Sequence, residues 1–145
     1  MMKDKGPTMF TVLRAAKLLV SASLLAFCMT SAAYAEVGTP RITAGVFEGN
    51  GKLMVKVRHP GAYEGCYVTI NGGLTSDSQD TAIVGRQITA REAAAGRATI
   101  RTARRYYCSK RNLYINAEVV CLTDEVAQLN SAVKRVAVPS SNVRR

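Results

Sequence analysis

Residues 104–111 combine four cationic side chains with two tyrosines. Guanidinium groups hold phosphate and sulfate oxygens in pairs, and tyrosine rings stack on sugars or bases. The segment therefore predicts a site for an anionic envelope or extracellular polymer; of such polymers, nucleic acid is not expected. The competing interpretation is a loop that its cations keep solvated while the tyrosines cover the end of the domain. Two arginines on the polar face of a neighbouring strand extend the set. The predicted binding residues are Arg97, Arg101, Arg104, Arg105, Tyr106, Tyr107, Lys110 and Arg111.

Groups that could support catalysis are sparse. His59 is the only histidine and precedes Pro60, so we interpret it as an exposed turn residue. A nucleophilic pair of His59 with Cys66 is conceivable, but the sequence supplies no third residue to orient the imidazole. The sequence also contains no nucleophile elbow, phosphate loop or zinc-ligand spacing. We therefore expect no enzyme, no metal site and no cofactor, with a small periplasmic hydrolase as a less favoured alternative.

The first 35 residues have the three parts of a secretory signal peptide. Four cations precede the apolar run 18–27, and Ala33-Tyr34-Ala35 forms a small-residue cleavage motif. The run is too short for a bilayer span of about 20 residues. Cys28 follows a bulky Phe27, which argues against lipid attachment. We expect cleavage after Ala35, giving a secreted or periplasmic protein of 110 residues without an integral membrane anchor.

The positive charge lies in the second half of the predicted mature chain. The whole sequence has a formal net charge of +10, but residues 36–85 carry −1 and residues 86–145 carry +8. This asymmetry favours a non-enzymatic binding module that engages an anionic partner through its basic C-terminal half. The alternative is a structural or assembly subunit, or an inhibitor, that acts by sheet-edge pairing or through an unpaired cysteine.

Apolar and polar residues alternate with a period of two along most of the mature chain. The clearest runs are 53–58, 66–71, 97–102 and 113–121, and a period of two is typical of half-buried antiparallel strands. Thr89, Glu92 and Gly96 have the spacing of a capping box and a glycine stop, which predicts a short helical turn near 90–95. The C-terminal stretch fits either a last strand over 131–138 or a helix, and we favour the strand because of its valines.

The rhythm of the last strands resembles a known fold. The patterns Gly96-x-Ala98-x-Ile100 and Tyr114-x-Asn116-x-Glu118-x-Val120, followed by 132–138, resemble the last three strands of immunoglobulin-like and fibronectin-III-like domains. The resemblance implies an all-β, antiparallel β-sandwich of about seven strands over 36–138, followed by a basic flexible tail over 139–145. A small β-barrel, or a β-domain with a C-terminal helix, is the alternative.

Three cysteines remain after the predicted cleavage, so at least one has no partner within the chain. In an immunoglobulin-like topology the start of the third strand lies beside the end of the sixth. The resemblance therefore implies a disulfide between Cys66 and Cys121, which leaves Cys108 as the candidate free thiol. A Cys66–Cys108 disulfide, or no disulfide at all, stays open at this stage.

Overall fold

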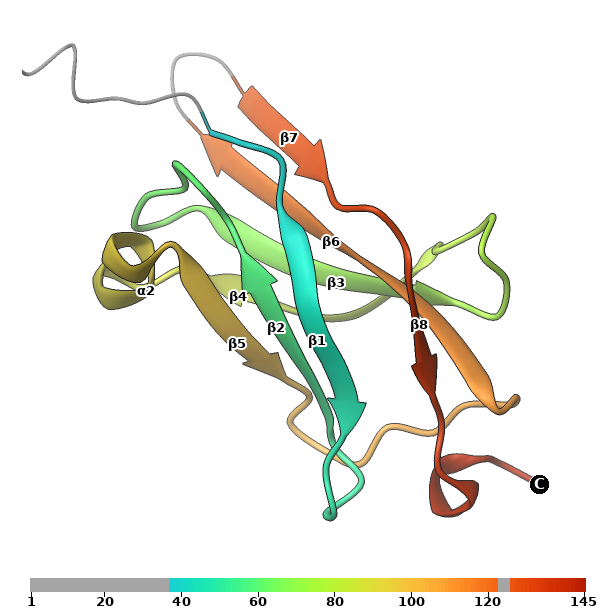
Figure 1. Cartoon of the computed structure of the whole chain (residues 1–145). Coiled ribbons are helices and arrows are strands. Elements are labelled where there is room, and N and C mark those ends of the chain that lie inside the picture. Colours follow the sequence, from blue (N-terminus) through green and yellow to red (C-terminus); the bar gives the residue numbers. More distant parts are fainter. Residues whose placement is uncertain (1–36, 123–125) are drawn as a thin grey trace, which may run out of the picture. The chain divides into compact units, whose positions relative to one another are not determined.

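The computed structural model describes residues 37–122 and 126–145, and the predicted signal peptide lies outside these residues. Two antiparallel sheets pack against each other (Figure 1). The first sheet contains β1 (Arg41–Phe47), β2 (Leu53–Arg58) and β5 (Arg97–Arg101), in the order β1-β2-β5.

The second sheet contains β3 (Tyr67–Gly73), β4 (Thr81–Gln87), β6 (Asn112–Leu122), β7 (Val126–Asn130) and β8 (Lys134–Ala137). Its order is β4-β3-β6-β7, and β8 also pairs with β6. The expected all-β, antiparallel sandwich is therefore confirmed. One difference from antibody constant domains is that the fourth strand lies beside the third, not beside the fifth.

The last strand is interrupted rather than continuous. The helical alternative for the C-terminal stretch is wrong, and the favoured strand forms as β8, which is shorter than the expected 131–138. The sequence did not predict β7, which pairs with the adjoining part of β6. Between β7 and β8, the Ser131 amide donates to the Ala117 carbonyl, and the Ser131 hydroxyl accepts from the Ala117 amide, both at 2.8 Å. The serine side chain thus replaces one backbone contact where the strand breaks.

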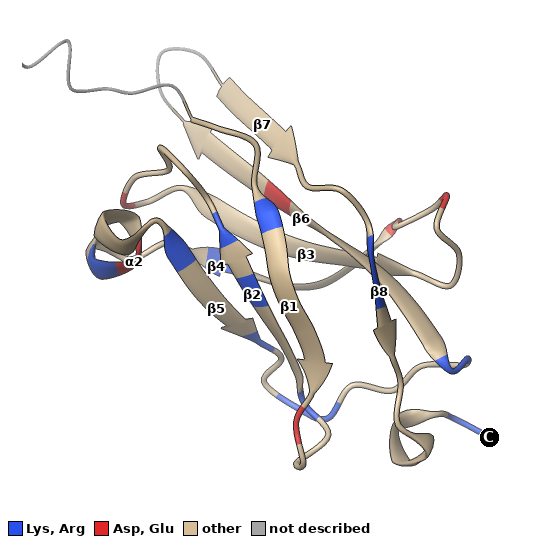
Figure 2. Ribbon diagram, viewed as in Figure 1, with Lys and Arg blue, Asp and Glu red and all other residues tan. Residues whose placement is uncertain are grey.

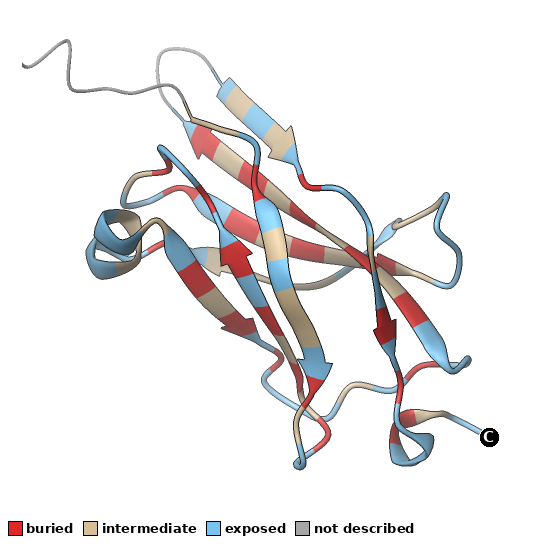
Figure 3. Ribbon diagram, viewed as in Figure 1, coloured by how far each residue is buried: buried red, intermediate tan, exposed pale blue. Residues whose placement is uncertain are grey.

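The core lies between the two sheets and consists of the inward set of each alternating run (Figure 3). β6 shows the pattern most clearly, since buried and partly exposed residues alternate along most of its 11 residues. Burial of these apolar side chains is the main favourable contribution to folding. The largest fully buried apolar residues are Leu53, Val55, Val57, Val68, Ile70, Ile100, Ile115 and Val119.

A disulfide joins Cys66 and Cys121, as the resemblance implied. Both residues are fully buried, and their Cα atoms are 4.4 Å apart. Cys66 lies just before β3 and Cys121 near the end of β6, so the bond links neighbouring strands of one sheet. Antibody domains, in contrast, link their two sheets to each other. Cys108 is a free thiol and is buried, and its burial raises the pKa of the thiol.

Residues 139–145, which we call the C-terminal strap, are not the flexible tail that the sequence predicted. They contain the 3-10 turn η1 (Ser140–Asn142), and the Asn142 side chain is buried. Its amide nitrogen donates to the carbonyls of Gly51 and Tyr106, both at 2.8 Å. The backbones of Cys108 and Asn142 are also hydrogen-bonded. The prediction failed because an asparagine that follows two serines is typical of solvated loops, and its two carbonyl partners are remote in sequence.

The expected helical turn forms α2 (Ala90–Ala95) between β4 and β5. The Thr89 hydroxyl accepts from the Glu92 amide at 3.2 Å, and the Glu92 carboxylate accepts from the Thr89 amide at 3.0 Å. Gly96 ends the helix with a φ of 68°, which favours glycine. Within the described ranges, no helix is long and apolar enough to cross a bilayer.

Candidate functional site

Three arginines form a row across the outer face of the first sheet. In β5, Ala98 and Ile100 face the core, which directs Arg97 and Arg101 outward. The strand register places Arg58 of β2 opposite both Arg97 and Arg41. Residues opposite each other in a sheet share a face, so the three guanidinium groups lie side by side on the outer face, one from each strand. Figure 2 marks the positions of the cations along β1, β2 and β5.

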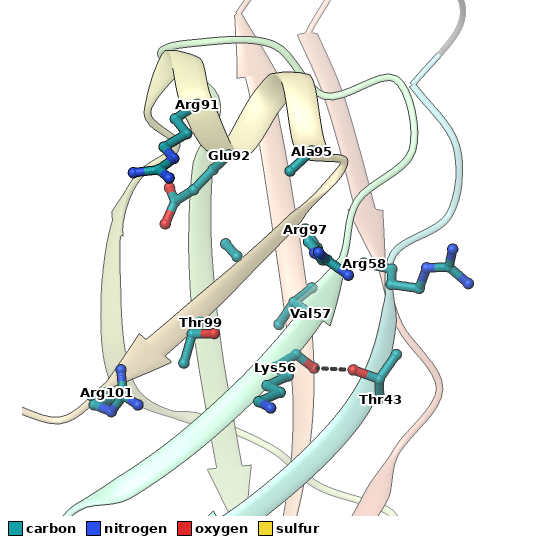
Figure 4. Close-up of a pocket in the computed structure, with 11 residues that line it drawn as sticks. Thr43, Lys56, Val57, Arg58, Arg91, Glu92, Ala95, Arg97, Thr99 and Arg101 are labelled. Carbon is teal, nitrogen blue, oxygen red and sulfur yellow. Dashed lines mark hydrogen bonds between the residues drawn. The ribbon is translucent and has the colours of Figure 1, made fainter.

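An open hollow of about 930 Å³ lies on this face, beside the junction of α2 with the start of β5 (Figure 4). We call it the cationic hollow. Five of its lining residues are basic and one, Glu92, is acidic. The lining residues are Thr43, Lys56, Val57, Arg58, Arg91, Glu92, Ala95, Arg97, Ala98, Thr99 and Arg101.

The carboxylates beside the hollow are already paired. Glu48 accepts from Arg101 at 3.0 Å. Glu92 accepts from both terminal nitrogens of Arg86 at 2.6 and 2.8 Å, and this hydrogen bonding lowers its pKa to about 2. Among the described residues, the hollow cations without an ion pair are Lys56, Arg58, Arg91 and Arg97. The hollow therefore presents uncompensated positive charge.

The Arg86–Glu92 pair fixes α2 to the strands beneath it. Arg86 comes from β4 in the second sheet and also donates to the Thr99 carbonyl in the first sheet at 2.9 Å. We expect Glu92→Gln to lower the free energy of unfolding by about 2 kcal/mol, since a bidentate charged pair and a capping contact are both weakened. Urea unfolding at pH 7 measures the loss. It should shrink below pH 4.5, where unfolded Glu92 protonates; a pH-independent loss would contradict the ion pair's role.

The structure separates the sequence-predicted binding residues into two groups. Arg97 and Arg101 line the cationic hollow, whereas Arg104, Arg105, Lys110 and Arg111 lie exposed in the loop after β5, away from α2. None of the loop cations lines the cationic hollow.

The two tyrosines of the loop have different surroundings. Tyr106 is half-buried against the core, and this burial raises the pKa of its phenol. Tyr107 is exposed, and the guanidinium carbon of Arg144 lies 5.7 Å from the centre of its ring. Only Tyr107 therefore presents a ring surface to solvent, and the strap's arginine lies over it.

Sequence reasoning missed three cations of the hollow. Lys56 and Arg58 belong to β2, in the less basic half of the chain, and Arg91 belongs to α2, in the basic half. The alternation in 53–58 did place Lys56 and Arg58 on one polar face. The alternation does not show which strands are neighbours, and it is the pairing of β2 with β5 that brings Arg97 beside Arg58.

His59 is fully buried, so its interpretation as an exposed turn residue is wrong. Its amide donates to the Gly96 carbonyl at 3.0 Å, which extends the β2–β5 pairing one residue beyond Arg58 and Arg97. Because Arg58 points outward, the next side chain points inward. Neither ring nitrogen has a hydrogen-bond partner among the described residues, and burial lowers the pKa of His59 against a smaller opposing effect of Glu92.

The buried histidine predicts a loss of stability in mild acid. Its pKa is lowered in the folded state, so the unfolded chain takes up the proton first, near its ordinary pKa of 6.5. The free energy of unfolding should be constant above pH 7 and should fall as the pH drops from 6.5 to 5. Urea unfolding at pH 7.5 and 5.5 tests this, with His59→Leu as the comparison. An equal fall in both proteins would show that His59 is not the cause.

Catalytic and metal-binding groups are not gathered elsewhere in the described part of the chain. No cluster of three or more His, Cys, Asp or Glu side chains that could hold a metal ion occurs within 37–122 and 126–145. His59 and Cys66 are both buried, and Cys66 is committed to the disulfide.

Comparison with known protein families and with curated proteins found no match to this chain.

Proposed function

We propose that this protein is a non-enzymatic extracytoplasmic binding module that engages an anionic partner through the cationic hollow. The observation that carries the proposal is the row of arginines on β1, β2 and β5, beside carboxylates that are already paired. Guanidinium groups in such a row supply forked donors to the oxygens of a bound anion.

The arrangement is unfavourable for an isolated fold. Like charges directly opposite each other in a sheet are destabilising, and Arg58 has one such neighbour on each side. Threonine or glutamate at position 58 would relieve the repulsion. The excess charge is therefore better explained by an anion that neutralises it than by stability, because proteins tolerate strained or repulsive arrangements at functional sites.

Two further features support the extracytoplasmic and non-enzymatic parts of the proposal. The Cys66–Cys121 disulfide is the kind of bond that persists in oxidising compartments, in agreement with the predicted signal peptide. The histidine that a hydrolase would need is enclosed in the core and does not line the hollow.

Two matched quadruple variants test the proposal. The hollow variant changes Lys56, Arg58, Arg97 and Arg101 to Gln. The loop variant is the control and changes four cations of the loop after β5 to Gln. Retention on immobilised heparin, measured as the salt concentration at elution, should fall strongly for the hollow variant and slightly for the loop variant. Equal falls would indicate non-specific charge alone, and a larger fall for the loop variant would move the site to that loop. The control positions are Arg104, Arg105, Lys110 and Arg111.

A second candidate function is strand addition to β7. Among the described residues, this strand pairs with β6 alone. It contains no charged residue, and it begins at the exposed Val126, opposite the exposed Leu122. Uncharged edge strands are docking sites for extended segments of partner proteins. A complex that survives 1 M salt and is lost in Val126→Lys would favour this role. The alternative role through an unpaired cysteine would need an accessible thiol, and the Cys108 thiol is buried.

A further inference from the structure

The arginine row extends beyond the cationic hollow. A second, smaller hollow of about 380 Å³ lies at the start of β1 and includes Arg41 and Lys134 in its lining. Arg41 is also the cross-strand partner of Arg58, which lines the first hollow. The two hollows are therefore joined by adjacent cations. We call the continuous set the cationic belt: Arg91, Arg97, Arg58, Arg41 and Lys134.

The belt runs across the strands and not along them. It passes from α2 over β5, β2 and β1 to the start of β8 (Figure 2). Neighbouring strands are about 4.8 Å apart, whereas successive outward residues on one strand are about 7 Å apart. The shortest steps between Arg97, Arg58 and Arg41 are thus perpendicular to the strands, and these three positions together span about 10 Å. In Figure 4 the Arg58 side chain extends over the ribbon of β1, the strand that carries Arg41.

The pairing of arginines favours one class of anion. A single guanidinium fork already satisfies both oxygens of a carboxylate. A sulfate or phosphate ester has three free oxygens and can accept from Arg58 and Arg97 at the same time. The hydroxyls of Thr43 and Thr99, which also line the hollow, are suited to sugar hydroxyls or to the remaining oxygens.

Other polyanions fit this surface less well. The linings of both hollows, as far as the described residues form them, contain no aromatic side chain on which nucleic acid bases could stack. A narrow chain of sugar rings can follow the belt from one hollow to the other.

We infer that the cationic belt binds a linear glycan carrying sulfate or phosphate esters, laid across the strands of the first sheet. The inference rests on the proposed function and adds three statements to it: the ligand's chemical class, its direction on the sheet, and the participation of Arg41 and Lys134, which lie outside the first hollow.

The test compares two triple variants on ligands that differ in one chemical property. The belt variant changes Arg41, Arg58 and Arg97 to Gln, and the control changes Arg104, Arg105 and Arg111 to Gln. Calorimetric titration uses heparin oligosaccharides of increasing length and their fully desulfated forms, which keep the carboxylates. A phosphorylated oligosaccharide of matched length ranks phosphate against sulfate.

We expect desulfation to weaken binding to the native protein at least tenfold, and the belt variant to bind the sulfated ligand at least thirtyfold more weakly. The control variant should lose less than threefold. Affinity should rise with chain length at least until the oligosaccharide covers the about 10 Å between Arg97 and Arg41. The slope of log K against log salt should decrease by about 2 to 3 in the belt variant. Its melting temperature should not fall, because the changes remove like-charge neighbours.

The outcomes that would overturn the inference are distinct from failure of the proposed function. Equal affinity for sulfated and desulfated chains would exclude an ester-specific belt while leaving an anion-binding module intact. Tighter, belt-dependent binding to single-stranded DNA or to anionic phospholipid vesicles would assign the belt to another ligand class. A native protein that binds none of these polyanions would overturn both proposals.

Discussion

Replacing Cys66 and Cys121 together with alanine is expected to lower the free energy of unfolding by about 4 kcal/mol. The bond closes a loop with a sequence separation of 55, so its removal returns a large conformational entropy to the unfolded chain. Both cysteines are fully buried, and the lost sulfur contacts add to the cost. For a domain of this size, 4 kcal/mol is a large share of the total stability.

Urea unfolding monitored by circular dichroism measures this effect. Cys108→Ala is the matched control, because it removes a buried sulfur without opening a disulfide; its loss should stay near 1 to 2 kcal/mol. If the double variant were no less stable than this control, the disulfide would contribute nothing beyond packing. Treatment of the native protein with a reductant should reproduce the larger loss.

The second large effect is expected at the C-terminal strap. Asn142→Ala should cost about 2 to 3 kcal/mol, because it removes the amide that donates to the buried carbonyls of Gly51 and Tyr106. The Gly51 carbonyl keeps the amide of Tyr106 as a second donor. The Tyr106 carbonyl has no such replacement among the contacts of the described residues, so its desolvation dominates the cost.

The same change should expose a thiol. Cys108 is hydrogen-bonded through its backbone to both Asn142 and Arg144, so loosening the strap opens the cover over its side chain. A thiol reagent under native conditions should react with Cys108 at least tenfold faster in Asn142→Ala than in the native protein. Ser140→Ala, at an exposed position of the strap, is the control and should change neither stability nor reactivity. Unchanged reactivity in Asn142→Ala would mean that the strap does not protect the thiol.

The sequence predicted those features that depend on neighbouring residues. Alternation identified the strands, because a half-buried strand needs one apolar face, and the spacing of Thr89 to Gly96 identified α2. His59 was misread because a histidine before a proline usually marks a turn, and the inward direction of its side chain follows from pairing with Gly96. Local patterns do not contain such pairings.

The cationic belt illustrates the same limit at the level of function. Arg41, Arg58 and Arg97 are far apart in the sequence, and none stands in a charge-rich run. They become neighbours only through the register of β1, β2 and β5. The sequence predicts the binding site at its densest basic segment, 104–111, because the cations there are neighbours along the chain. Net charge predicts an anionic partner, whereas the strand register determines where the cations gather.

The contact between Arg86 and Thr99 has a consequence for selectivity. It ties the strand beneath the hollow to the opposite sheet, and Glu92 fixes the same arginine to α2. The floor of the hollow is therefore stiff, while the exposed arginine and lysine side chains above it keep their long, rotatable stems. A rigid base that carries movable charged arms adapts to ligands whose charges repeat at different intervals. Such a surface selects for charge density along a chain and tolerates variation in the identity of the individual sugars.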